Sequence, residues 1–115
     1  MLTTEQIKEA VERFNPDGFD LINDGDDIFE EWNIYIGGLY YLIDHIDDFV
    51  YDLFLDRVIQ GINREFKFQI HQLSGAIVIL SSVERMITFG HDGSTEGIRE
   101  AREKAIVFVL EELNK

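Results

Sequence analysis

The sequence predicts a small, mostly α-helical bundle of four to five helices that forms a single domain over residues 1–115. Apolar residues recur at the three- and four-residue spacing of amphipathic helices in several segments. The chain is long enough to bury one hydrophobic core and too short for two. No repeat, low-complexity tract or linker divides it. A small α+β domain with one hairpin in residues 65–82 is the alternative.

The first expected helix follows Thr3 or Thr4, because either side chain can cap a helix N-terminus. Its apolar positions keep helical spacing as far as Phe14. Residues 15–18, Asn-Pro-Asp-Gly, end it, since proline cannot continue the hydrogen-bond ladder and glycine permits a turn. We expect residues 19–27 to form an acidic loop.

Two interpretations of the segment after this loop stay open. Asp27 and Glu30 resemble a capping box, which predicts a short helix over residues 28–35. The alternation of apolar and polar residues over 32–36 predicts a strand instead. In either case Gly37-Gly38 marks a break or a point of close packing.

The strongest helical pattern covers residues 39–60, and we expect this helix to end near Gly61. Residues 65–89 fit two patterns. We favour one or two helices there, with two strands joined by a turn at 73–75 as the alternative. The last helix follows Ser94 or Thr95 as its cap.

The negative charge of the chain is concentrated in its first half. The formal net charge is −13, from 23 acidic and 10 basic residues. Residues 1–60 hold 15 acids and 3 bases, whereas residues 61–115 hold 8 acids and 7 bases. Between Arg13 and Arg57 there is no lysine or arginine. A solvated surface normally mixes charges of both signs, so this window suggests a binding face.

Four aspartates within this window recur at every fourth residue of the expected helix 39–60, and Asp47 lies beside them. We call this row the aspartate stripe, and it consists of Asp44, Asp48, Asp52 and Asp56. Like charges at this spacing cost about 0.2–0.5 kcal/mol per pair in helix stability. Tyr40 and Tyr51 are expected on the same surface as interface anchors. The bland alternative is a helix face that is merely solvated.

The composition argues against several functional classes. Without cysteine there is no zinc–thiolate site and no thiol nucleophile. Residues 20–31 match the EF-hand calcium loop in part, but Ile22 stands where a ligand is required. His45, His71 and His91 lack the spacing of metal ligands and an identifiable nucleophile partner. We therefore expect no enzymatic activity, no cofactor and no metal.

The function that these observations favour is binding of a basic protein. We expect an acidic inhibitor, most concretely an immunity protein that occludes the cleft of a cognate nuclease-type toxin. A nucleic-acid mimic and a helical structural or regulatory module are the alternatives. The candidate partner-binding residues are Asp24, Asp26, Asp27, Glu30, Glu31, Tyr40, Asp44, Asp47, Asp48, Tyr51, Asp52 and Asp56.

The charge also predicts which partners the protein avoids and where it resides. A chain this acidic is unsuited to direct contact with nucleic acid or anionic lipid. Residues 1–14 lack the features of a signal peptide, and the longest apolar run, residues 76–80, is too short to cross a bilayer. We expect a cytoplasmic protein, and the oligomeric state stays open.

Overall fold

The computed structural model describes residues 1–23, 25, 31–64, 67–81 and 85–115. The described residues form three α-helices, one 3-10 helix and two three-stranded sheets. In chain order these elements are α1 (Thr4–Phe14), β1 (Asp20–Asn23), β2 (Trp32–Ile36), β3 (Leu39–Leu42), η1 (Ile43–His45), α2 (Asp48–Arg64), β4 (Phe68–Leu73), β5 (Ala76–Ser81), β6 (Met86–Gly90) and α3 (Thr95–Leu113).

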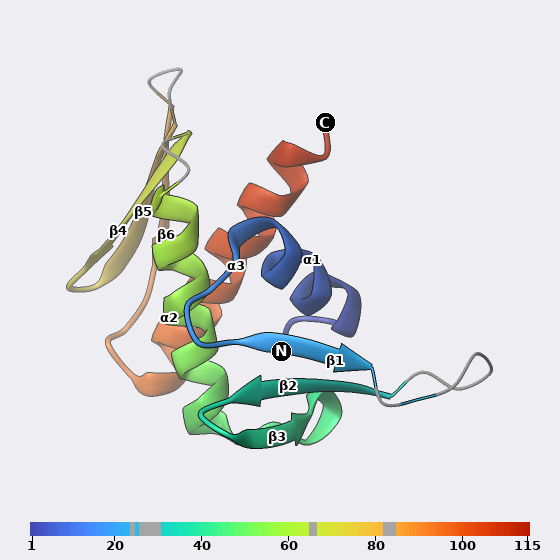
Figure 1. The fold of residues 1–115 in the computed structure, drawn as a ribbon. Coiled ribbons are helices and arrows are strands. Elements are labelled where there is room, and N and C mark those ends of the chain that lie inside the picture. Colours follow the sequence, from blue (N-terminus) through green and yellow to red (C-terminus); the bar gives the residue numbers. More distant parts are fainter. Residues whose placement is uncertain (24, 26–30, 65–66, 82–84) are drawn as a thin grey trace.

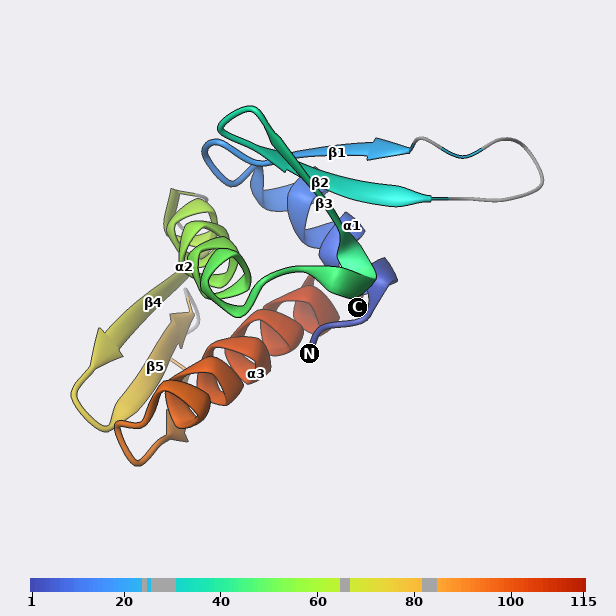
Figure 2. The same ribbon diagram turned by 90° about the horizontal axis from the view of Figure 1, so that it is seen from below.

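The fold is therefore α+β, and the expected helical bundle is wrong. Both sheets are antiparallel, with strand orders β1-β2-β3 and β4-β5-β6. Figures 1 and 2 show the three helices lying between the two sheets. The core combines side chains of all three helices with those of both sheets, and Phe54 of α2 is its largest fully buried side chain.

The first helix follows its sequence signals. The Thr3 hydroxyl accepts a hydrogen bond from the Gln6 backbone, and the Gln6 side chain accepts one from the Thr3 backbone, which completes a capping box. The helix ends at Asn15, which adopts a left-handed conformation with φ 45°. Both the predicted start and the predicted stop of this helix are confirmed.

The helix expected over residues 39–60 is wrong in its first nine residues, since α2 begins only at Asp48. Residues 39–42 form β3, which pairs with β2, so the strand interpretation of residues 32–36 is the correct one. Gly37 and Gly38 have φ values of 57° and 86° and join the two strands by a two-residue turn. Such a turn needs positive φ at both positions, and glycine meets that need without strain. Residues 39–42 thus form a strand of a hairpin, although the spacing of their apolar residues is that of a helix.

Gly61 does not end α2, which continues to Arg64. It lies where α2 crosses the end of α1, because a Cβ atom at this position would stand 2.2 Å from the Phe14 carbonyl oxygen. The glycine is needed for close helix packing, and not as a stop signal.

The helices favoured for residues 65–89 are also wrong within the described part of that segment. Residues 68–81 and 86–90 contain the antiparallel strands β4, β5 and β6, which extend the single hairpin of the alternative by a third strand. Ile70 faces Ile79, and Ile79 faces Ile87. These β-branched residues share the face that packs against α2 and α3. Ser94 caps α3 as predicted, and its hydroxyl accepts a hydrogen bond from the Gly97 backbone.

Candidate protein-binding surface

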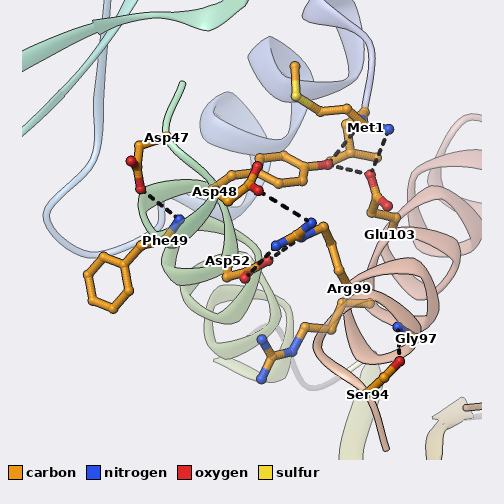
Figure 3. Close-up of polar contacts among 12 residues, drawn as sticks. Met1, Asp47, Asp48, Phe49, Asp52, Ser94, Gly97, Arg99 and Glu103 are labelled. Carbon is orange, nitrogen blue, oxygen red and sulfur yellow. Dashed lines mark hydrogen bonds and ion pairs between the residues drawn. The ribbon is translucent and has the colours of Figure 1, made fainter. Parts of the chain in front are cut away.

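The aspartate stripe is divided into a paired half and an open half. Asp52 accepts hydrogen bonds from Arg99 Nε at 2.6 Å and Arg99 Nη2 at 2.9 Å, in a two-bonded ion pair between α2 and α3 (Figure 3). Asp56 accepts hydrogen bonds from the side-chain amides of Gln60 and Gln72. Asp52 and Asp56, which the sequence pattern placed on the partner-binding face, thus bind side chains of their own chain.

Arg99 places a positive charge beside the segment between Arg13 and Arg57, which itself contains no lysine or arginine. Its hydrogen bonds with Asp52 raise the pKa of the guanidinium further, and the nearby charges of Asp52 and Asp48 act in the same direction. Arg99 stays cationic at every physiological pH. Arg102, one turn farther along α3, lies 4.0 Å from Asp56. Part of the negative charge of α2 is thus compensated from a helix some fifty residues away in sequence.

Tyr51 was expected as an exposed anchor, but it is buried, with 2% of its surface accessible. Its hydroxyl accepts a hydrogen bond from the Leu2 backbone at 2.8 Å and donates one to Glu103. Burial, followed by the hydrogen bond to the Glu103 carboxylate, raises the pKa of Tyr51 well above its usual value. Tyr51 therefore holds α2, α3 and the start of the chain together, and its side chain is buried where an exposed one was expected.

The open half of the stripe lies at the start of α2. Asp47 caps this helix: its carboxylate accepts a hydrogen bond from the Phe49 backbone, and its carbonyl accepts one from the Tyr51 backbone. Asp48 is the first helical residue, and its side chain is 86% exposed, 4.0 Å from Arg99. Asp44 is exposed in η1. These three carboxylates remain accessible as predicted.

Two aromatic residues are exposed on the same stretch of chain. Phe49, which directly follows Asp47 and Asp48, is 76% exposed and points away from α3 in Figure 3. The sequence pattern placed it on the buried face of the expected helix, so this residue was missed. Tyr40 on β3 is 59% exposed as expected, with its ring centroid 4.9 Å from that of Tyr35.

The structure brings two of the predicted residues, Glu31 and Asp44, to one cavity of about 430 Å³. Glu5 from the first turn of α1 joins them, so that acidic residues from three separate segments line it. Trp32, the first residue of β2, contributes an indole to the wall. We call this feature the acidic cavity. The remaining lining residues are Thr4, Leu42, Ile43 and His45.

The side chain of Lys8 already lies beside Trp32. The Lys8 ammonium is 4.2 Å from the centroid of the Trp32 ring and 3.6 Å from a Glu5 carboxylate oxygen. An ammonium over an indole face is a cation–π contact. Lys8 therefore already compensates part of the negative charge of Glu5 beside Trp32. Sequence reasoning missed Glu5 and Lys8, because only the fold brings the first turns of α1 next to β2 and η1.

Four of the predicted binding residues, Asp24, Asp26, Asp27 and Glu30, lie outside the described residues. Within residues 1–23, 25, 31–64, 67–81 and 85–115, no group of three or more acidic, histidine or cysteine side chains is placed to hold a metal ion. In the same residues, no helix is both long and apolar enough to cross a membrane.

Comparison with models of protein families, with curated proteins and with solved structures finds no match to this chain. The interpretation of the surface therefore depends on its geometry and charge.

Proposed function

We propose that the protein is a non-enzymatic binding protein that neutralises a basic protein partner, and that the acidic cavity receives a lysine or arginine side chain of that partner. In its concrete form, the partner is a nuclease-type toxin and the protein is its immunity protein. The proposal depends on one observation: Glu5, Glu31 and Asp44 line the same cavity as Trp32.

The cavity has the chemistry that a cationic side chain requires. Glu31 and Asp44 supply carboxylate acceptors for a guanidinium or ammonium group, whereas Glu5 already pairs with Lys8. A charge-assisted hydrogen bond is stronger than a neutral one. The indole of Trp32 offers a π-face of the kind that already holds Lys8.

The surroundings of the cavity resemble the composition of a protein interface. Asp47 and Asp48 extend its negative charge to the start of α2, where Phe49 is exposed. Leu39 and Tyr40, which precede the cavity-lining residues 42–45 in the chain, are each 59% exposed on β3, and Tyr40 lies on the opposite face of the sheet from Trp32. Aromatic side chains are enriched in interfaces, and a few of them commonly supply most of the binding energy. This combination favours a protein partner over a small cation.

The proposed mechanism is steric occlusion assisted by electrostatic attraction. A toxin that cleaves nucleic acid carries basic residues in its cleft, because these hold the phosphates. The acidic surface of this chain is attracted to that cleft and raises the rate of encounter. Once seated, the protein excludes the substrate by its volume, and no residue of the chain needs to react.

Mimicry of nucleic acid is less well supported, since the regular row of charges on α2 is interrupted. Asp52 and Asp56 are engaged by Arg99, Gln60 and Gln72. Only the start of the row, together with carboxylates from other elements, is left for a partner. Such an irregular arrangement suits one cognate protein better than a general nucleic-acid site.

The test applies to any neighbouring gene that encodes a basic protein. That gene is expressed in a host that naturally lacks both it and the gene for this chain. We expect it to stop growth alone and to permit growth when this chain is co-expressed. The purified pair should form a complex whose affinity falls at least tenfold between 50 and 300 mM NaCl.

For any such neighbour, failure of this chain to restore growth would contradict the immunity role. If the complex formed but its affinity did not change with salt, the role of the acidic surface would be wrong.

A further inference from the structure

Lys8 is held beside the acidic cavity by contacts with two of the residues that line it. Its ammonium lies 4.2 Å from the centroid of the Trp32 ring and 3.6 Å from a Glu5 carboxylate oxygen. The Lys8 side chain is 19% exposed, so most of it is shielded from solvent. A carboxylate and an indole face around one ammonium group have the chemistry of a binding site for an organic cation.

The two contacts arise because the fold places α1 next to the sheet β1-β2-β3. Glu5 and Lys8 are three residues apart on α1, so their side chains lie on the same side of the helix. Trp32 begins β2, and α1 lies against this sheet in Figures 1 and 2. The Lys8 ammonium is therefore held between two elements that only the tertiary fold brings together.

Each contact of Lys8 is weak enough to be exchanged. Glu5 is 83% exposed, and an ion pair with so exposed a partner contributes little, because water competes for the charges. A single cation–π contact is likewise modest. The flexible stem of a lysine also allows its ammonium to move into solvent while the helix stays in place.

We propose that Trp32 and Glu5 form a binding site for an ammonium or guanidinium group, and that Lys8 is its internal occupant, which an incoming cation displaces. Two cations cannot take the same position, and they repel one another when they are close. Lys8 thus competes with a cationic side chain that enters the acidic cavity. The competition with a protein partner rests on the proposed function, whereas the occupancy of the site by Lys8 does not.

The proposal predicts that loss of the Lys8 ammonium strengthens the binding of a cation. Lys8→Met keeps an unbranched side chain and removes the charge, so that an added cation no longer has to displace a charged group of the chain. Lys104→Met is the matched control, at an exposed lysine of α3 that does not line the acidic cavity. Both variants make the net charge more negative by one, so a general effect of charge cancels between them.

The test is a titration of the full chain with n-butylammonium chloride, an analogue of the lysine side chain, at constant ionic strength. Binding is followed by the fluorescence of Trp32, the only tryptophan in the sequence. We expect the dissociation constant of Lys8→Met to be at least threefold lower than those of the wild type and of Lys104→Met, which should agree within twofold. n-Butanol, which has the same alkyl chain without a charge, should give no saturable change.

Lys8→Gln takes the place of Lys8→Met if that variant fails to fold. Equal dissociation constants for the Lys8 variant and Lys104→Met overturn the proposal, because Lys8 would then not occupy the site. Saturable binding of n-butanol with the same dissociation constant, or no saturable binding of n-butylammonium to the Lys8 variant, also overturns it.

A second titration uses the basic partner that the co-expression experiment identifies. The Lys8 variant should bind this partner at least threefold more tightly than Lys104→Met. If the partner binds both equally, the competition by Lys8 is wrong and the proposed function stands. If n-butylammonium distinguishes the variants but no basic protein is neutralised, the proposed function is wrong and the ammonium site stands.

Discussion

Asp52 and Asp48 lie one turn apart on α2, yet the structure assigns them different roles. Asp52 forms two hydrogen bonds with Arg99, and both side chains are largely shielded from solvent. Asp48 is almost fully exposed. We expect Asp52→Asn to lower the free energy of unfolding by about 1–3 kcal/mol, because a hydrogen-bonded charge pair is broken. Asp48→Asn should change it by less than about 0.5 kcal/mol.

Urea denaturation of the two variants at pH 7 provides the comparison. Each removes one negative charge from the same helix, so a general effect of net charge cancels between them. An equal loss of stability in both would contradict the ion pair as a structural contact.

Tyr51 makes stability depend on pH in the alkaline range. A tyrosine in the unfolded chain ionises near pH 10. In the folded protein, burial and Glu103 raise the pKa of Tyr51, so it keeps its proton. The folded state then binds more protons than the unfolded state, and stability falls as pH rises. The slope from this residue is about 1.4 kcal/mol per pH unit above pH 10.

Tyr51→Phe removes this slope together with the hydroxyl. At pH 7 we expect the variant to be about 1–2 kcal/mol less stable, since the Leu2 backbone loses its acceptor. Above pH 10 the difference from the wild type should shrink. Tyr40→Phe, on an exposed side chain, should change stability at pH 7 by less than about 0.5 kcal/mol. A stability difference between wild type and Tyr51→Phe that is constant from pH 7 to 11.5 would disprove the account.

The crossing of α1 and α2 depends on the absence of a side chain at Gly61. Alanine is favoured over glycine in a helix interior by about 1 kcal/mol. At Gly61, however, its Cβ would collide with the Phe14 backbone carbonyl, which cannot move alone. We expect Gly61→Ala to destabilise the protein by about 1–3 kcal/mol.

Gly97 in α3 is the matched control for this crossing. A Cβ there meets first the Asp92 carboxylate, the end of a side chain that can rotate away. Gly97→Ala should therefore cost less than Gly61→Ala in thermal or urea denaturation. The reverse order would show that the two helices do not cross as closely as the structure has them.

The elements that sequence reasoning predicted correctly are those with local signals. Thr3, Asn15 and Ser94 cap or end helices through bonds within a few residues, and such bonds can be read from sequence. Residues 39–47 failed although their apolar spacing fits a helix. Residues 68–81 and 86–90 failed because their spacing fits both a helix and a strand. Pairing with neighbouring strands decided between them, and periodicity contains no information about pairing.

At the scale of the whole molecule, the excess negative charge could be predicted, but its distribution in space could not. The stripe assumed that residues 44–56 form one continuous helix, and the break before Asp48 separates Asp44 from the other three. The pairing of Asp52 with Arg99 and the convergence of Glu5, Glu31 and Asp44 both join distant parts of the chain. Such contacts follow only from the tertiary fold.

We propose that the acidic cavity, and not the negative charge of the chain in general, binds the basic partner. Isothermal titration calorimetry with the basic partner that the co-expression experiment identifies, and with two charge-matched double variants of this chain, compares the cavity with charge elsewhere. Glu31→Gln/Asp44→Asn changes the cavity, while Glu12→Gln/Glu100→Gln removes two exposed charges from α1 and α3. We expect at least a tenfold loss of affinity for the cavity variant Glu31→Gln/Asp44→Asn and less than a threefold loss for Glu12→Gln/Glu100→Gln. Equal losses in the two variants would contradict it.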